Sequence, residues 1–183
     1  MITIEKTNLA GILLIKPKIF ADSRGHFLEV YRKQLLKQNG IDIDFVQDNV
    51  SKSTKGTLRG LHYQKPPSSQ AKLVMAVHGK VLDVAVDMRK YSATFGQHFS
   101  AELSSQNRHM MFIPSGFAHG FSVLSDEATI YYKCSDYYNK ELECGVRWDD
   151  SDLNINWKVD NPILSDKDQS LPYFKAVEND DLF

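Results

Sequence analysis

The segment Leu58-Arg59-Gly60-Leu61-His62-Tyr63-Gln64 carries the residue best suited to proton transfer. Histidine is a natural general base, because its ordinary pKa of about 6.5 lies near neutral pH. In an extended strand alternate side chains share a face, so we expect His62 beside Gly60 and opposite Arg59. Gly60 then leaves space beside the imidazole. Taken alone, however, the segment favours a hydrogen-bonded core histidine over a catalytic one.

Two further strand-like segments carry an acid and a cation. Tyr132 lies in the segment 129–134, and its phenol can donate a proton, because an ordinary tyrosine has a pKa of about 10 and starts protonated. Lys72 opens the apolar run 72–77 and can point at a developing oxyanion. Packing among strand aromatics for Tyr132, and projection into solvent for Lys72, are the commoner situations for such residues alone.

The run Pro114-Ser115-Gly116-Phe117-Ala118-His119-Gly120-Phe121 predicts a turn, after which the chain re-enters a strand at Phe121. Its P-x-G-x-x-H spacing resembles the second motif of cupin barrels, where the histidine often binds a metal. The first cupin motif would place another histidine two positions after His62, with a glutamate soon after. Gln64 stands there instead and no glutamate is near, so we expect no bound metal.

The elements that must position these residues are mostly strands. We expect a hairpin in which His78-Gly79-Lys80 joins two strands. A short helix is expected near Ser165, where Ser165-x-x-Asp168 resembles a capping box. Many short strands with few helices predict a β-sandwich or barrel, since a parallel α/β fold would need helices between its strands. The expected strands are 9–15, 27–31, 72–77, 81–87, 109–113, 121–124 and 129–134, and the expected interior helix is 31–38, with Gly40 as its stop.

Length and composition narrow the function classes. A chain of 183 residues predicts one domain spanning residues 1–183. The net charge of -1 argues against general binding of nucleic acid. The sequence contains no run of about 18 apolar residues, so it predicts no membrane helix. The first residues lack signal-peptide character, so we expect a cytoplasmic protein. Cys134 and Cys144 fit no metal or disulfide spacing and are interpreted as ordinary thiols.

Several segments together, in order along the chain, resemble the dTDP-4-dehydrorhamnose 3,5-epimerase family of the cupin superfamily. The resemblance implies an all-β, cupin-type jelly-roll barrel with a few short peripheral helices. It also implies a homodimer with exchanged N-terminal strands, and neither a metal nor an organic cofactor. The matching segments are residues 20–25, 45–49, 58–62, 72–74, 114–121, 132–133 and 162–168.

The resemblance also implies a role for individual residues. His62 matches the family's base, Asp168 the carboxylate that orients it, Tyr132 the acid, and Lys72 the residue beside the enolate oxygen. Arg24 is expected to reach the site from the partner subunit. The positions that resemble the substrate-binding set, for a dTDP-linked 4-keto-6-deoxy sugar, are Arg24, Glu29, Gln47, Asp48, Asn49, Arg59, Lys72, His119, Tyr138, Glu143 and Lys167.

The implied chemistry needs no cofactor, because a 4-keto group acidifies C3–H and C5–H and accepts the electrons itself. Two points require a particular geometry. Asp168 must reach His62, although its position also suits a helix cap, and the strand must bend at Gly60 if Arg59 is to hold a diphosphate. Three alternatives stay open: an epimerase acting at C3 or C5 alone, a metal-dependent cupin, and a non-catalytic sugar-binding cupin.

Overall fold

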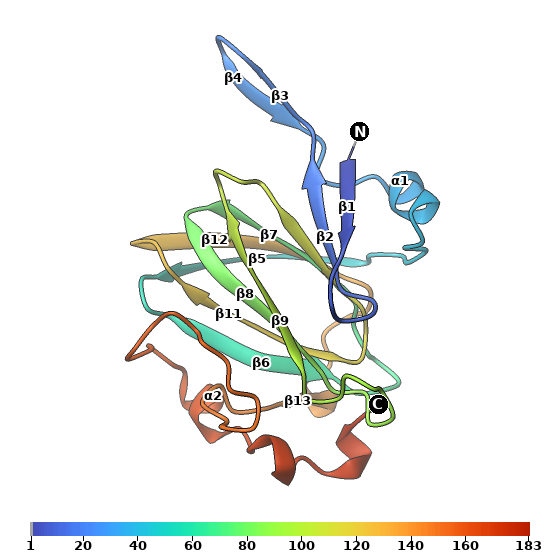
Figure 1. Ribbon diagram of the computed structural model, residues 1–183, viewed down its shortest axis with the longest axis vertical. Coiled ribbons are helices and arrows are strands. Elements are labelled where there is room, and N and C mark those ends of the chain that lie inside the picture. The colour runs from blue at the N-terminus through green and yellow to red at the C-terminus, as the bar shows by residue number, and fades with distance from the viewer. Residues whose placement is uncertain (1) are drawn as a thin grey trace.

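Two antiparallel sheets packed face to face form the body of the molecule in the computed structural model, which describes residues 2–183 (Figure 1). One sheet has the strand order β1 (Ile2–Lys6), β2 (Leu13–Pro17), β10 (Met110–Ile113), β7 (Lys72–His78), β12 (Glu127–Cys134) and β5 (Gln47–Thr54). The other has the order β13 (Glu143–Gly145), β6 (Leu58–Gln64), β11 (Phe117–Val123), β8 (Lys80–Asp87) and β9 (His98–Ser104). This double-sheet arrangement is a jelly-roll barrel, as expected.

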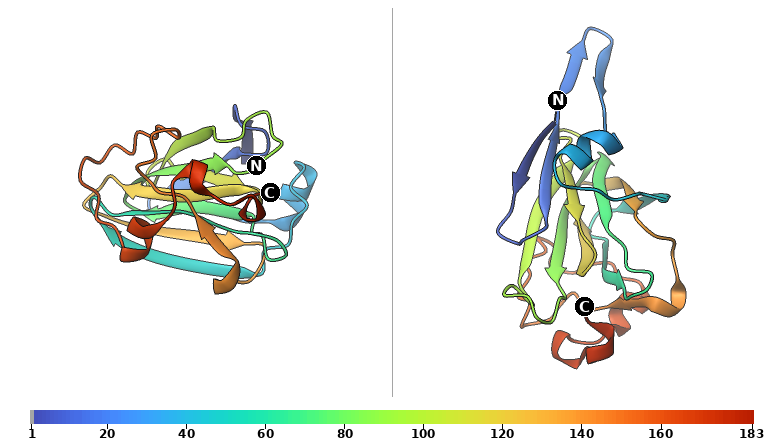
Figure 2. Two further views of the ribbon diagram at one scale, coloured as in Figure 1. Left: turned by 90° about the horizontal axis from the view of Figure 1, so that it is seen from below. Right: turned by 90° about the vertical axis from the view of Figure 1, so that its right-hand side faces the viewer.

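The remaining elements are peripheral. The hairpin of β3 (Ile19–Asp22) and β4 (Gly25–Leu28) projects from one end of the barrel, opposite the C-terminal segments (Figure 2). The α-helices are α1 (Lys33–Gln38) and α2 (Asp166–Ser170), and the 3₁₀ turns are η1 (Lys140–Leu142), η2 (Phe174–Ala176) and η3 (Asn179–Asp181). Among the described residues, no helix is both long and apolar enough to cross a membrane.

Apolar side chains lie in three layers. Val74, Val81 and Phe121 belong to the layer between the sheets, while alternate residues of the same strands face outwards. The outer face of the five-stranded sheet is covered by the C-terminal part of the chain, in which the Phe183 ring lies 5.8 Å from the ring of Tyr63. The outer face of the six-stranded sheet is covered by α1 and the segment after it. The last residues, for which the sequence offered no match, therefore complete the core.

The strands at 72–77, 81–87 and 109–113 are confirmed, but the hairpin expected at Gly79 is wrong. β7 and β8 lie in different sheets, so the chain turns a corner from one layer to the other. Gly79 has φ +71°, and a Cβ there would lie 2.0 Å from the carbonyl oxygen of Glu127. A sharp corner and a hairpin turn both require such a glycine, so the local sequence does not distinguish them.

Several predicted boundaries were also wrong. β11 begins at Phe117 rather than Phe121, because the turn needs only the residues 114–116. β2 begins at Leu13 rather than Leu9, and β4 ends at Leu28 rather than at residue 31. β5 and β9 were not predicted, because both strands contain many polar residues and lack the apolar pattern that marks a buried strand. The helices at 33–38 and 166–170 lie where helices were expected.

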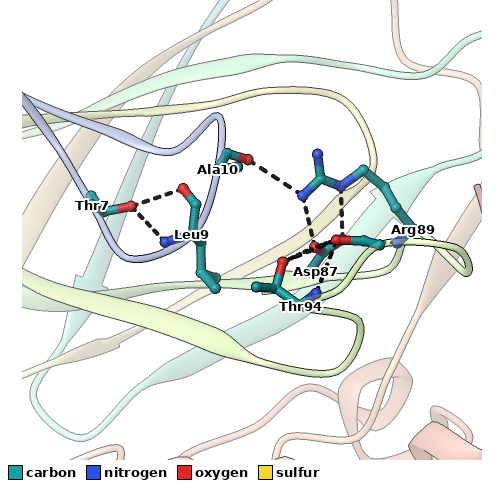
Figure 3. A network of polar contacts seen from close by, with 7 residues as sticks. Thr7, Leu9, Ala10, Asp87, Arg89 and Thr94 are labelled. Carbon is teal, nitrogen blue, oxygen red and sulfur yellow. Dashed lines mark hydrogen bonds and ion pairs between the residues drawn. The ribbon is translucent and has the colours of Figure 1, made fainter.

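A polar network closes the barrel near the turn between β1 and β2 (Figure 3). The buried carboxylate of Asp87 accepts hydrogen bonds from Arg89 Nε at 2.8 Å, Ser92 Oγ at 2.6 Å and Thr94 Oγ1 at 2.6 Å. Arg89 Nη2 also donates to the carbonyl of Ala10 at 3.3 Å. Burial raises the pKa of Asp87, but these donors outweigh it and hold the pKa at about 2. The carboxylate is thus ionised and fully used in joining β8 to the first turn.

Candidate active site

A cavity of about 840 Å³ is lined by His62, Lys72, His119, Tyr132 and Asp168. A second hollow, of about 320 Å³, shares His62, Lys72 and Tyr132 with it. The residues expected to carry the chemistry therefore lie where the two hollows meet. The volume of the larger cavity is in the usual range for a small-molecule site, so the cavity has room for a sugar with attached groups.

Strand alternation brings these side chains together from both sheets. Lys72 shares the inner face of β7 with Val74, and Tyr132 shares the inner face of β12 with Ile130. His62 on β6 lies directly opposite its cross-strand neighbour His119 on β11. His62 and Tyr132 therefore project into the cavity from opposing sheets.

His62 and Asp168 are in close contact, with 2.6 Å between Nε2 and Oδ1. Asp168 can take part in the cap of helix α2 and contact His62 at the same time. The Asp168 amide donates to Ser165 Oγ at 3.1 Å, and that hydroxyl donates to Asp168 Oδ2 at 2.8 Å, which leaves Oδ1 for the imidazole. Burial raises the pKa of Asp168, but His62, Ser165 and the Gly60 backbone together hold it below the ordinary value. Asp168 is therefore a carboxylate fixed to a helix start and aimed at His62.

Tyr132 has the protonation that an acid needs, and Lys72 has a side-chain amine without a partner among the described residues. Burial raises the pKa of Tyr132 despite the opposing charge of Arg59, so the phenol keeps its proton near neutral pH. Burial lowers the pKa of Lys72, and the charges of Cys134 and Asp83 oppose that shift. Within residues 2–183 the ammonium of Lys72 forms no hydrogen bond or ion pair, so its donors are free for a ligand.

The bend that Arg59 requires is present in β6. His119 pairs with His62 and Phe121 with Arg59, so β6 has one more residue than β11 between these pairs. This bulge lets Arg59 and His62 line the same cavity, although an ideal strand would put them on opposite faces. Gly60 has φ +108°, and a Cβ there would lie 2.6 Å from the carbonyl oxygen of His119. Arg59 Nε donates to Ser53 Oγ at 3.0 Å, so its Nη atoms remain for an anion.

Several of the expected binding residues gather at the second hollow. Gln47, Asn49, Tyr138 and Glu143 line it, and Tyr138 OH donates to Glu143 Oε2 at 2.7 Å. Lys167 lines the larger cavity and pairs with Glu143 at 2.5 Å, so it spans the two hollows. The exposed ring of Tyr138 offers a surface on which a planar base can stack.

Asp48 lies outside the cavity. Strand alternation places it on the outer face of β5, where its carboxylate accepts hydrogen bonds from Lys133 Nζ at 2.6 Å and Tyr131 OH at 3.1 Å. A contiguous run such as 47–49 cannot turn all three side chains inwards. Asp48 therefore does not face the cavity with Gln47 and Asn49, and its assignment to the substrate-binding set stays a prediction.

Arg24 and Glu29 also lie away from the cavity of their own chain. Arg24 is at the tip of the projecting β3–β4 hairpin, exposed and paired with Asp22 at 2.6 Å (Figure 1). Glu29 follows that hairpin and pairs with Arg32 at 2.6 Å. Both residues can take part in a site only if the hairpin reaches a second copy of the chain.

Sequence reasoning missed three inward-facing residues. Gln64, at the position of the absent cupin histidine, donates to the carbonyl of Tyr137 at 3.1 Å and accepts from the amide of Asn139 at 2.7 Å. It thereby holds the loop that carries Tyr138. Ser53 supports Arg59, and Asp83 pairs with His119, as described below. The period-two alternation of polar residues in β5 was the one signal available for Ser53. No group of three or more His, Cys, Asp or Glu side chains within residues 2–183 is arranged to hold a metal.

A jelly-roll barrel with a His–carboxylate pair, a neutral phenol and a free ammonium around one cavity defines a cupin-type acid–base isomerase. The family model described as dTDP-4-dehydrorhamnose 3,5-epimerase matches residues 6–176. The chain belongs to this family.

Individual relatives agree with that assignment. The dTDP-4-dehydrorhamnose 3,5-epimerase of Shigella flexneri is 52% identical over 164 residues, which cover 89% of this chain and 91% of the relative. The crystal structure of a dTDP-6-deoxy-D-glucose-3,5-epimerase from Legionella pneumophila Philadelphia 1, in complex with dTDP-4-keto-L-rhamnose, superposes with a TM-score of 0.96. It is 42% identical, and the match covers 100% of this chain and 97% of that one. The structure of ChmJ, a 3'-monoepimerase from Streptomyces bikiniensis, in complex with dTDP-quinovose, is also similar, with a TM-score of 0.86, 36% identity, and coverage of 91% and 85%.

Proposed function

We propose that the chain converts dTDP-4-dehydro-6-deoxy-D-glucose to dTDP-4-dehydro-L-rhamnose by epimerisation at C3 and C5, in the biosynthesis of dTDP-L-rhamnose. The observation that carries this proposal is the position of His62 and Tyr132 on opposing sheets of one cavity. Inversion of a carbon requires a base on one face of the sugar ring and an acid on the other. A ring held between the two sheets meets both.

The reaction proceeds through an enolate at each carbon. His62, oriented by Asp168, takes the proton from C5 or C3, and the electron pair of the C–H bond moves into the 4-keto oxygen. The free ammonium of Lys72 stabilises the negative oxygen. Tyr132 then gives its proton to the opposite face of the carbon, and the ketone re-forms. Exchange of protons with solvent returns His62 and Tyr132 to their starting states, so no redox change occurs.

The nucleotide is held by Arg59 in the larger cavity and by residues around the second hollow. Arg59 presents two free guanidinium nitrogens, which suit a diphosphate oxygen pair. Tyr138 offers a stacking surface for the base, and Gln47 and Asn49 offer amide donors and acceptors. These roles are proposals that rest on position and chemistry.

Heavy-water exchange with dTDP-4-dehydro-6-deoxy-D-glucose is the most direct test. If both C3 and C5 are epimerised, the product carries deuterium at both carbons, and mass spectrometry with NMR locates it. Deuterium at one carbon alone would identify a mono-epimerase, the activity named for ChmJ. An absence of exchange at both carbons would refute the proposed function.

We also propose a homodimer in which each β3–β4 hairpin reaches the partner's cavity. The hairpin exposes Phe20 and Phe27, which are 51% and 67% accessible, and it carries Arg24 away from its own barrel. β5 is an edge strand that exposes Val50 beside the cavity. Apolar surfaces of this kind mark contact sites.

Mixed dimers test this exchange. Arg24→Ala and His62→Asn are each expected to be nearly inactive alone. If Arg24 acts across the dimer, mixing the refolded variants restores about a quarter of wild-type activity, because half of the dimers are mixed and one of their two sites is intact. No restoration would show that Arg24 acts within its own chain or not at all. Light scattering measures the assembly state.

A cytoplasmic location is proposed from the two free thiols, Cys134 and Cys144, which suit a reducing compartment. Cell fractionation with antibody detection tests it, and recovery in a periplasmic or secreted fraction would contradict it.

A further inference from the structure

Asp83 is a fully buried carboxylate that the mechanism above does not use. It lies on the inner face of β8 between Val81 and Ala85, both of which belong to the apolar layer between the sheets. A carboxylate in such a layer is costly unless positive charge and hydrogen bonds compensate for its lost hydration. The question is therefore which groups compensate for it.

The first of these groups is His119, whose Nε2 lies 2.7 Å from Asp83 Oδ1. His119 is two positions from Phe121, the residue opposite Asp83 in register, so the contact runs diagonally between β11 and β8. The imidazole of His119 is directly opposite His62 on the neighbouring strand β6 and lines the same cavity. The hydrogen bond with Asp83 thus fixes the orientation of the His119 ring in the cavity. Asp83 Oδ2 is buried and has no hydrogen-bond partner among residues 2–183.

The second group is Lys72, which lies on the inner face of β7 in the opposing sheet, so Lys72 and Asp83 both face the layer between the sheets. Burial lowers the pKa of Lys72, and the groups whose charge opposes that shift are Cys134, Asp83 and Glu143. Burial raises the pKa of Cys134, so it is a neutral thiol near neutral pH. Glu143 is already paired with Lys167 at 2.5 Å. Asp83 is left as the carboxylate with an unused oxygen. The other titratable groups lining the cavity are Lys52, Arg59, His62, His119, Tyr132, Lys167 and Asp168.

We propose that Asp83 is a positioning residue of this active site, which fixes the ring of His119 and places a negative charge opposite Lys72. The proposal rests on the proposed function, in which Lys72 stabilises the negative charge that develops on the 4-keto oxygen. It adds that a residue out of reach of the substrate sets the charge of the residue that stabilises the enolate. One barrel then holds two His–carboxylate pairs side by side: His62–Asp168 moves protons, and His119–Asp83 holds charge.

Asp83→Asn tests this, because it removes the charge and keeps the size. We expect kcat to fall about 10- to 100-fold, as is common for supporting groups behind a reactive centre, with KM nearly unchanged. The pKa of Lys72 should fall when the opposing anion is lost, so the basic limb of the kcat–pH profile should move to lower pH by about one unit. An unchanged profile with a folded variant would overturn the proposal.

Asp87→Asn is the matched control. Asp87 is equally buried and lies on the same face of β8, but its carboxylate is satisfied by Arg89, Ser92 and Thr94. This variant should lower the melting temperature and leave the position of the basic limb unchanged. An equal shift in both variants would show a structural effect of losing any buried carboxylate, and would overturn the role given to Asp83.

Two further measurements decide the outcome if Asp83→Asn does not fold or if the substrate is wrong. His119→Asn leaves Asp83 free for Lys72, so the basic limb should stay or move to higher pH, and a downward shift would contradict the proposal. The titration of the Lys72 side chain, followed by NMR of ¹³C-labelled lysine without substrate, should move to lower pH in Asp83→Asn and not in Asp87→Asn. That titration needs no turnover, so it separates failure of this inference from failure of the proposed function.

Discussion

Asp83 in the middle of strand β8 and Asp87 at its end are both buried, but their carboxylates have different surroundings. Asp87 receives hydrogen bonds from two arginine nitrogens, two hydroxyls and a backbone amide, so none of its capacity is left over. Around the cavity, Lys72 has no partner within residues 2–183 and Asp83 keeps one unpaired oxygen. Full satisfaction stabilises the fold, whereas unsatisfied charge is held in place by the barrel and is available to a ligand.

This contrast gives a way to tell structural charge from functional charge in the same core. Changes at the satisfied network should alter stability and leave turnover intact. Changes at the unsatisfied groups should do the reverse, because those groups contribute little to the free energy of unfolding. The following changes test the comparison in that sense.

The largest effect is expected for His62→Asn. It removes the base, so kcat should fall about 10²- to 10⁴-fold, while the melting temperature and the affinity for dTDP change little. Steady-state assays with the 4-keto sugar and calorimetry with dTDP measure the two sides. His78→Asn, at the exposed corner between β7 and β8, is the control and should keep full activity. Unchanged turnover in His62→Asn would remove His62 from the mechanism.

Lys72→Met should follow, with a loss of about 10²- to 10³-fold in kcat, the usual cost of losing an oxyanion donor. Because a desolvated and unpaired ammonium is replaced by an apolar chain, the variant should be as stable as the wild type or more so. Lys133→Met is the matched control. Its ammonium is also buried, but it lies on the outer face of β12 and pairs with Asp48 at 2.6 Å. That variant should lose stability and keep turnover, and the opposite pattern would contradict the distinction.

Asp87→Asn should act on stability alone. The pKa of Asp87 is about 2 in the folded chain, below its ordinary 3.8, so the carboxylate contributes stability above pH 4 that is lost as the pH falls towards 2. The difference corresponds to about 2 kcal/mol. Urea unfolding at several pH values should show this loss in the wild type and a flatter dependence in Asp87→Asn. Equal pH dependence in both proteins would show that Asp87 is not the group responsible.

The sequence was enough for the class of fold. It was the resemblance to the family, and not alternation alone, that pointed to Lys72 and Tyr132 as cavity residues. The sequence was not enough for the pairing of strands. The glycine at residue 79 suits both a hairpin and a corner between sheets, and the choice between them depends on contacts with β10, β11 and β12 far along the chain. Asp48 was grouped with Gln47 and Asn49 because the three residues match one motif, although alternation along β5 puts it on the other face.

The sequence also could not reveal Asp83 or the double use of Asp168. A single aspartate in an apolar strand gives no signal of its partner, which is 36 residues away in sequence. The helix cap and the imidazole pair were treated as competitors, since a sequence pattern does not assign the two oxygens of a carboxylate separately. Both features depend on the direction in which side chains point, which is set by packing of the complete barrel.

Ser165→Ala sharpens that last point with the smallest expected effect. Ser165 caps α2 and donates to Asp168 Oδ2, while the pair with His62 uses Oδ1. Loss of the cap should cost about 1 kcal/mol in the free energy of unfolding. Since Asp168 loses one of the donors that lower its pKa but keeps His62, kcat should fall less than in Asp168→Asn, by under about 10-fold. Ser170→Ala, at the end of the same helix, is the control for helix stability and should leave kcat unchanged. A loss in Ser165→Ala as large as in Asp168→Asn would mean that the hydroxyl, rather than the helix start as a whole, aims the carboxylate at His62.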